Sequence, residues 1–333
     1  MNQKLKKLIE QKYNIGKIKN ITKSSRGYLS HNYIIKTDGQ KYFLKKKQTL
    51  NNNDEKMNFI CQATIFFAHQ GIPIIEPIKT KDEKYFFKFE KNFHLLFPYV
   101  TGIKRERGKL SGKQIESMGA MMAKLHLAGR NGYPILERRI TKSWSKNRFY
   151  QTYNEVIEVI KGKKKLDQID KLFLEEMELK KDFVDKNTLS LEDFKLKSNH
   201  LVHGDYHDSN VLFDGKSNVK YIFDLKSVIT PRVLELIRTI DMIFFKPKIS
   251  ERSFACAKLF LKSYQAIYPI SKEELTNGIR ARITKSYYTL WKEEEYYLNG
   301  NKSVSRIIAS TIIGIKYYND NTDIFIEKLT ADF

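Results

Sequence analysis

The middle of the chain holds a short loop in which carboxyl and amide side chains crowd between apolar runs. Residues 203–210 read HGDYHDSN, and Asp224 follows two further apolar runs. Phosphoryl transfer needs a carboxylate that accepts a hydroxyl proton, and amide and carboxylate oxygens that hold magnesium on the phosphates. Asp205, Asn210 and Asp224 have the residue types for these three roles. Each of them alone would be typical of a turn or a cap, so their fixed order is what favours a reactive site.

The histidines of this loop and its remaining carboxylate have supporting roles in this interpretation. His203 precedes Gly204 and Asp205, and we expect it to brace the backbone by hydrogen bonds rather than to act as a base. His207 and Asp208 are expected to face solvent or substrate. The predicted chemistry therefore depends on the carboxylates and the amide named above.

The flanking segments predict how the loop is positioned. Apolar runs at 201–202, 211–213 and 221–223 alternate with polar residues, and a glycine between the last two provides a turn. This pattern is typical of a loop followed by a β-hairpin. A hairpin that begins at Asn210 would return Asp224 to the same end of its sheet.

The first hundred residues have the turn and strand signals of a small antiparallel sheet with one helix. Asp38 and Gly39 form a hairpin signal. A segment with apolar residues at helical spacing follows, with Asp54 as its expected first residue and Gly71 just after its end. The expected strands are 18–22, 32–36, 41–46, 85–89 and 93–97, and the expected helix is 54–70. Beyond residue 102 the pattern is mainly helical, with a helix at 112–128, a long polar tract at about 150–184, and several helices after about residue 250.

Bulk properties narrow the class of protein. The 333 residues suffice for two lobes that each bury a core. The formal net charge is +22, but the lysines are spread along the whole chain, so a nucleic-acid partner is not favoured. Cys61 and Cys256 are far apart and indicate neither a disulfide framework nor a zinc site. No segment resembles a signal-peptide core or a run of about 18 apolar residues, so we expect a cytoplasmic protein without a membrane partner.

The reactive loop also resembles a known family. HGDYHDSNVLF followed by YIFDL is similar to the catalytic and metal-binding loops of aminoglycoside phosphotransferases and choline kinases. Further similar segments, in the same order along the chain, are GYLSHNYIIKTDGQKYFLKK, GIPIIEPI, LLFPYVTG and MGAMMAKLH. The resemblance implies an α+β, bilobal protein-kinase-like fold. A small N-lobe (1–98) would hold a five-stranded antiparallel sheet and one helix, and a larger, mainly helical C-lobe (99–333) would hold the catalytic loop, the metal site and the acceptor-binding helices.

The same resemblance implies site residues. Asp205 would be the catalytic base, and Asn210 and Asp224 would hold Mg²⁺. Lys45 would neutralise the α- and β-phosphates of ATP, with Lys46 and Lys47 as competitors, because alternation alone does not fix which of them faces the nucleotide. The remaining expected nucleotide contacts come from the hairpin and the hinge, and they are Ser30, Asn32, Phe97, Tyr99 and Val100.

Three positions depart from the family pattern. The helix expected at 54–70 has no central glutamate to pair with Lys45. Lys226 stands where many relatives have an acidic residue, two positions after the metal-binding Asp224. Glu235 occupies the place of an aspartate that braces the catalytic loop, and a glutamate can do the same with a longer reach.

The implied activity is transfer of the γ-phosphate of ATP to a hydroxyl group of a small molecule, with ATP, Mg²⁺ and a hydroxyl-bearing acceptor as partners. Two alternatives remain open. Subgroup likenesses indicate a serine/threonine protein kinase of the bacterial stress-response type. The missing helix glutamate and Lys226 would suit a catalytically weak pseudokinase or a spore-coat-like structural protein.

Overall fold

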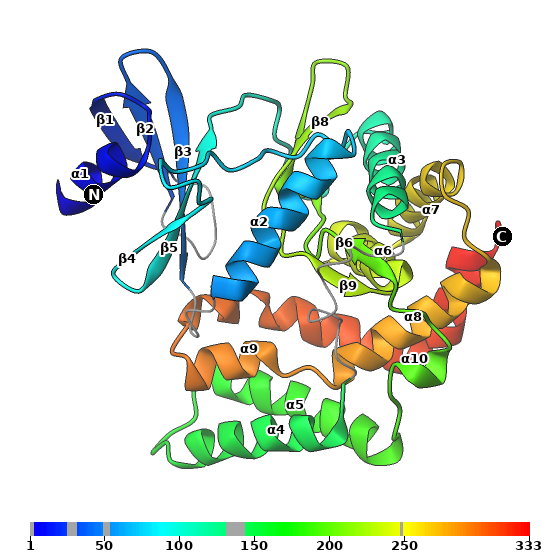
Figure 1. Cartoon of the computed structure of the whole chain (residues 1–333). Coiled ribbons are helices and arrows are strands. Elements are labelled where there is room, and N and C mark those ends of the chain that lie inside the picture. The colour runs from blue at the N-terminus through cyan, green and yellow to red at the C-terminus, as the bar shows by residue number, and fades with distance from the viewer. Residues whose placement is uncertain (1–2, 25–31, 49–53, 131–143, 247–248) are drawn as a thin grey trace. The chain divides into compact units, whose positions relative to one another are not determined.

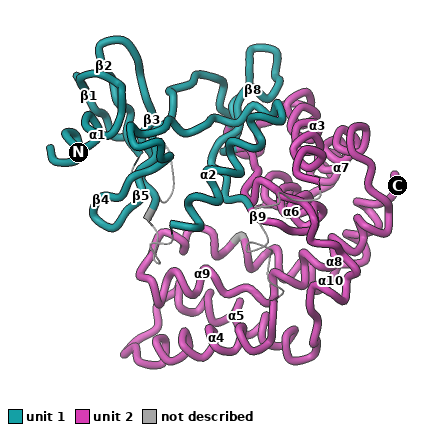
Figure 2. The backbone as a smooth tube through the Cα atoms, in the orientation of Figure 1, with its two compact units in different colours: residues 1–105, 209–227 teal, residues 106–208, 228–333 magenta. Residues whose placement is uncertain are grey.

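The chain folds into two compact units, and each unit is formed by two separate segments of the sequence (Figure 2). The computed structural model describes residues 3–24, 32–48, 54–130, 144–246 and 249–333. Unit 1 comprises residues 1–105 and 209–227, and unit 2 comprises residues 106–208 and 228–333. The lobe boundary expected at residue 98 stays a prediction.

Unit 1 is built on a five-stranded sheet, as expected (Figure 1). Its strands lie in the order β1-β2-β3-β5-β4, and every neighbouring pair is antiparallel. The strands are β1 (Ile18–Lys23), β2 (Tyr33–Thr37), β3 (Lys41–Gln48), β4 (Phe87–Phe89) and β5 (Asn92–Pro98). Strand β5 is buried along a continuous run from Asn92 to Leu96, as expected for a strand that is covered on both faces, whereas most of β1 at the edge of the sheet is exposed.

Two helices cover the sheet. Helix α1 (Gln3–Lys12) packs Leu5 and Ile9 against Leu44 of β3 on one face. Helix α2 (Asp54–His69) belongs to a second cluster, in which Met57 packs with Leu95 of β5. The expected helix at 54–70 is therefore confirmed within one residue at its end.

Segment 209–227 joins unit 1 through backbone hydrogen bonds. Its strands β7 (Val211–Phe213) and β8 (Val219–Ile222) form an antiparallel hairpin. Ile222 donates from its backbone N–H to Pro73 at 2.8 Å, and Phe213 donates to Ile103 at 2.9 Å. The hairpin predicted from the sequence is therefore present, and the first lobe's loops hold it.

Unit 2 is mainly helical and carries one small antiparallel pair of strands, β6 with β9. The strand bounds are β6 (His200–Val202) and β9 (Val228–Thr230). The main helices are α3 (Gly112–Ala128), α4 (Lys146–Lys161), α5 (Gln168–Lys186), α6 (Arg232–Ile240), α7 (Glu251–Gln265), α8 (Lys272–Tyr287) and α10 (Ile308–Thr330). Shorter turns are η2 (Glu192–Phe194), η4 (Asp241–Phe245), α9 (Trp291–Glu293), η5 (Glu294–Leu298) and η6 (Lys302–Ile307), and η3 (Asp208–Asn210) lies where the chain passes from unit 2 to unit 1. Together with the sheet of unit 1, this content confirms the expected α+β class.

The polar tract expected at about 150–184 is two helices rather than one. Helix α4 ends at the cap residue Gly162, and α5 begins after Asp167. Asp167 and Asp170 exchange hydrogen bonds between side chain and backbone at 2.8 and 3.0 Å, which satisfies two amide groups at the helix start. Helical periodicity continues through both segments, so only these caps reveal the break.

Helices α3 and α7 approach each other closely in the core of unit 2. A Cβ atom at Gly119 would lie 2.4 Å from the backbone oxygen of Phe260, so only glycine allows this contact. Among the described residues, no helix is long and apolar enough to cross a membrane.

Candidate active site

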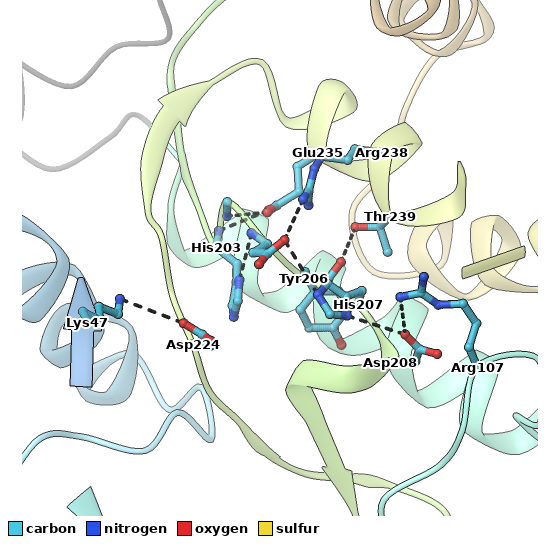
Figure 3. A network of polar contacts seen from close by, with 12 residues as sticks. Lys47, Arg107, His203, Tyr206, His207, Asp208, Asp224, Glu235, Arg238 and Thr239 are labelled. Atoms are coloured by element: carbon cyan, nitrogen blue, oxygen red, sulfur yellow. Dashed lines mark hydrogen bonds and ion pairs between the residues drawn. The ribbon is translucent and has the colours of Figure 1, made fainter. Parts of the chain in front are cut away.

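Lys45 and Asp224, which the sequence assigns to the nucleotide phosphates and the metal, form an ion pair in unit 1. Lys47 lies on the same carboxylate oxygen, with its Nζ 3.9 Å from Asp224 Oδ1 (Figure 3). Strand register explains this choice of lysines, because Lys45 pairs with Leu95 and thus shares the α2 face of the sheet. Lys46 points to the opposite face, so of the two competitors only Lys47 accompanies Lys45.

The charges of this group hold one another in defined protonation states. Burial by itself would raise the pKa of Asp224, but the positive charges of Lys45, Lys47 and Lys226 lower that pKa below its ordinary value. Burial and the nearby Lys45 lower the pKa of Lys47 to about 8, against the opposing pull of Asp224. Asp224 therefore stays ionised at neutral pH, while Lys47 can lose its proton in a mildly alkaline solution.

The hairpin brings Asn210 and Asp224 to one end, as the sequence predicts. Val211 pairs with Ile222, and the backbone N–H of Phe223 donates to the carbonyl of Asn210 at 3.1 Å. Asp224 follows directly with a φ of 66°, in the left-handed region that aspartate tolerates better than most residues. The turn directs the chain away from the strand immediately after the paired residues.

Asn210 and Asp224 offer the kinds of oxygen atom that magnesium takes as ligands. The ion pairs of Lys45 and Lys47 with Asp224 are both through Oδ1 of that carboxylate. Across the described ranges, no three His, Cys, Asp or Glu side chains gather in a way that could hold a metal by themselves. Magnesium commonly takes one or two protein oxygens and completes its shell with phosphates and water, so a carboxylate and an amide suffice.

The remaining predicted nucleotide contacts are less informative. Asn32 is buried, and its carbonyl accepts a hydrogen bond from Ser24 at 2.8 Å, while Ser30 lies outside the described residues. Phe97 ends strand β5 together with Pro98, and Tyr99 and Val100 follow it half-buried. The backbone N–H of Tyr99 donates to Lys41 at 3.2 Å and is therefore already used. Their nucleotide contacts stay predictions.

In unit 2, helix α6 holds the reactive loop by three side chains. Glu235 accepts hydrogen bonds from the backbone N–H groups of Gly204 (2.5 Å) and His203 (3.1 Å). Arg238 donates to Asp205 Oδ1 at 2.6 Å, and Thr239 donates to the carbonyl of Tyr206 at 2.8 Å (Figure 3). Positions 235, 238 and 239 share one face of a helix, so one rigid element fixes four consecutive loop residues.

A second layer of buried hydrogen bonds supports Glu235. His126, at the end of α3, contacts Glu235 Oε2 at 3.0 Å through Nε2 and the hydroxyl of Tyr264 at 2.9 Å through Nδ1. Burial would raise the pKa of Glu235, but the hydrogen bond to His126 and the nearby His203 and Arg238 lower that pKa below its ordinary value. Glu235 therefore braces the loop as a carboxylate, in the role expected from the sequence.

The positions expected for His203, His207 and Asp208 do not all agree with the structure. The prediction for His203 is confirmed, because its Nδ1 accepts a hydrogen bond from the backbone N–H of Asp205 at 3.1 Å. The expectation that Asp208 faces solvent or substrate is wrong, because its side chain is fully buried and pairs with Arg107 at 3.4 Å and with His207 at 3.5 Å. His207 is also largely buried. Loop residues are usually exposed, and the ion pairs with His207 and with the distant Arg107 help to offset the cost of burying this carboxylate.

Asp205 therefore lies among cationic groups. Besides Arg238, His207 places Nε2 at 3.7 Å from Asp205 Oδ1. Burial would lower the pKa of His207, but hydrogen bonds and charges from Asp205 and Asp208 raise that pKa above its ordinary value. Sequence reasoning missed Arg238 and Arg107, although the three-residue spacing of Glu235 and Arg238 on a helix could have indicated the first.

The sequence model of the phosphotransferase enzyme family matches residues 20–253 of the chain. A comparison with curated proteins gives no match.

Several solved structures share the fold. Spectinomycin phosphotransferase, solved with ADP and spectinomycin, is 18% identical with a TM-score of 0.65, and the match covers 95% of this chain and 98% of that one. The microcompartment-associated aminopropanol kinase is 11% identical with a TM-score of 0.65, covering 96% and 98%. Choline kinase from Cryptosporidium parvum is 12% identical with a TM-score of 0.58, covering 94% and 92%. At such identities the likeness establishes the fold, as the motifs predicted.

Proposed function

The chain belongs to the phosphotransferase enzyme family, and from this premise we propose that it transfers the γ-phosphate of ATP to a hydroxyl group of a small molecule. The observation that carries the proposal is the clamped loop of unit 2. Helix α6 holds Asp205 by an arginine and fixes the backbone on both sides of it. Such rigid placement of one carboxylate is what positioning of a proton acceptor requires.

In the proposed reaction, the acceptor oxygen bonds to the γ-phosphorus of ATP while the bond from that phosphorus to the β–γ bridging oxygen breaks and ADP leaves. Asp205 orients the acceptor hydroxyl and takes its proton. Lys45 neutralises phosphate charge from unit 1, and Asn210 and Asp224 would hold magnesium. When bound, magnesium supplies positive charge that stabilises the phosphates during transfer.

The basic composition is not needed for this function. Lys45 and Lys47 use only a small part of the formal charge of +22, and the proposal includes no nucleic-acid or membrane partner. A consumer of ATP is proposed to work in the cytoplasm, where ATP is supplied.

The test is magnesium-dependent ADP release from ATP, measured with a panel of acceptors that includes aminoglycosides, choline, homoserine, sugars and a serine-rich protein. Asp205→Asn should lower turnover by roughly 10²- to 10⁴-fold because it removes the proton acceptor. Asp224→Asn should abolish productive metal binding. Full turnover in either variant would refute the assignment of that residue.

One observation favours a catalytically weak alternative. Within the described part of α2, the only carboxylates are Asp54 and Glu55 at its first turn, and Asp54 pairs with Lys88 rather than with Lys45. Lys226 adds positive charge next to Asp224. Binding of ATP without turnover for any acceptor would support the pseudokinase, whereas stimulation by the serine-rich protein alone would support a protein kinase.

A further inference from the structure

Three cationic side chains of unit 2 belong to the helices α6 and α8, which pack against each other. Arg238 of α6 contacts the carboxylate of Asp205 at 2.6 Å. Arg282 and Lys285 lie three residues apart on α8 and therefore on one face of that helix. The two helices pack closely, because a Cβ atom at Gly278 would lie 2.2 Å from the side chain of Val233. Ile237, next to Arg238, lines one small cavity with Arg282. In keeping with this packing, burial and the charges of both arginines lower the pKa of Lys285 to about 8. We call Arg238, Arg282 and Lys285 the cationic cluster.

Nearby carboxylates do not neutralise this cluster. Asp241 of η4 lies 3.4 Å from Arg282, but it also pairs with Lys246 at 3.4 Å and accepts a hydrogen bond from the hydroxyl of Tyr318 at 2.8 Å. Asp241 is thus shared between two cations. One carboxylate cannot balance both, so positive charge remains on this side of the cluster.

Positive charge also remains uncompensated around Arg238 and Lys285. Asp205 serves Arg238 and also lies 3.7 Å from His207, whose raised pKa favours its charged form. Lys285 forms no ion pair with any described residue, and no carboxylate contributes to its lowered pKa. Keeping an unpaired ammonium in a partly buried place is unfavourable for folding, and such groups are concentrated at functional sites.

Two guanidinium nitrogens of the cluster are also unsatisfied. Nη1 of Arg238 and Nε of Arg282 are buried, and neither finds a hydrogen-bond acceptor among the described residues. Buried donors without an acceptor are rare in folded proteins. A carboxylate or phosphate group would supply the missing acceptors and the missing negative charge together.

We propose that the cationic cluster binds an anionic group of the acceptor, so that the substrate is a hydroxyl compound that also carries a carboxylate or a phosphate. This inference rests on the proposed function, in which Asp205 receives the acceptor hydroxyl. An anion bound by Arg238 would bring that hydroxyl close to Asp205, because Arg238 also contacts the Asp205 carboxylate. Choline and aminopropanol, for which two similar folds are named, carry positive charge and would be repelled here.

The first experiment titrates inorganic phosphate into the full chain by calorimetry, with saturating AMP-PNP and Mg²⁺ present so that the nucleotide site is filled. We expect saturable binding at one site. Lys285→Met should weaken it at least tenfold and leave the melting temperature unchanged or higher, because the substitution removes an unpaired, partly buried cation. Lys272→Met, at the exposed start of the same helix, is the matched control and should bind phosphate like the wild type.

The second experiment compares three sugars that differ only at carbon 6 under the same conditions. D-Glucuronate should bind more tightly than D-glucose, and D-glucose more tightly than 6-amino-6-deoxy-D-glucose, and Lys285→Met should remove this order. Absence of saturable phosphate binding, or equal binding in Lys285→Met, would overturn the proposal. It would also be overturned if Lys285→Met weakened AMP-PNP instead, because the cluster would then serve the nucleotide. Since every readout is binding, an anion site without ATP turnover would contradict the proposed function and leave this inference standing.

Discussion

Glu235→Gln is the substitution that most directly tests how the reactive loop is held. The wild-type carboxylate accepts three hydrogen bonds, from the backbone N–H groups of Gly204 and His203 and from Nε2 of His126. Glutamine offers one oxygen and one NH₂ group in the same space. If its oxygen faces Gly204, the NH₂ group faces the N–H of His203, and a flip of the amide only moves the conflict to Gly204.

The magnitude follows from these contacts. At least one hydrogen bond to a charged acceptor is lost and one buried donor is left unpaired, which costs about 2–3 kcal/mol of the free energy of unfolding. His126 can switch tautomer and accept from the NH₂ group, so we do not add a third loss. A shift of this size corresponds to roughly a 30- to 150-fold change in the unfolding equilibrium.

The assay is urea unfolding followed by tryptophan fluorescence. Both tryptophans, Trp144 and Trp291, belong to unit 2, so the signal reports the unit that holds the loop. The midpoint should fall for Glu235→Gln and stay unchanged for Glu273→Gln, an exposed glutamate on α8. Turnover should fall in parallel, since the backbone on the N-terminal side of Asp205 loses its anchor.

The pH dependence gives an independent check. The pKa of Glu235 is lower in the folded protein than its ordinary value of 4.5, so its stabilising contribution is complete above about pH 5.5 and is lost as the pH falls through the folded-state pKa. The difference between wild type and Glu235→Gln should be constant at neutral pH and shrink in acid. Equal urea midpoints at pH 7 would refute the clamp, and so would a difference that grows in acid.

Three further predictions follow from other parts of the structure. His94 is buried, and burial lowers its pKa to about 4. As the pH falls from 6.5 to 4, His94 should therefore lower the free energy of unfolding by ~1.4 kcal/mol per pH unit. His94→Leu should flatten this slope, measured by urea titrations at several pH values. Gly119→Ala should destabilise unit 2 by about 1–3 kcal/mol because its Cβ would meet a backbone oxygen, whereas Gly112→Ala on the same helix finds only an ordinary contact at 3.7 Å and should be neutral; equal melting temperatures would contradict this. Lys45→Met should lower kcat/KM for ATP roughly 100-fold because Lys45 faces Asp224, while Lys46→Met on the opposite face of β3 should change it little, and similar losses in both would refute the strand register.

Much of unit 1 could be predicted because its signals are local. The Asp38-Gly39 turn, the alternation in β3 and the helical spacing after Asp54 depend on neighbouring residues only. The hairpin between Asn210 and Asp224 is equally local, since only residues 214–218 connect its two short strands. These elements are present where the sequence predicts them, with ends that differ by a few residues.

The limits of local reasoning are visible in unit 2. The helical periodicity of the sequence predicts one tract over α4 and α5, because both helices are amphipathic and only the caps at Gly162 and Asp167 separate them. Strand β9 was missed because it pairs with β6 across about thirty residues and is only three residues long. Short strands that pair at long range have almost no periodic signal of their own.

By itself, the sequence determined the chemistry that this protein can attempt. The order of Asp205, Asn210 and Asp224 and the family motifs around them specify residue types, and residue types fix which protons, phosphates and metals a site can handle. The tertiary structure decided which groups surround each of them. The strand register places Lys45 and Lys47, and not Lys46, next to Asp224. Helix α6 lies beside the loop, so Glu235 and Arg238 contact it. Burial and electrostatic coupling act between residues that are distant in the chain, so no local pattern records them.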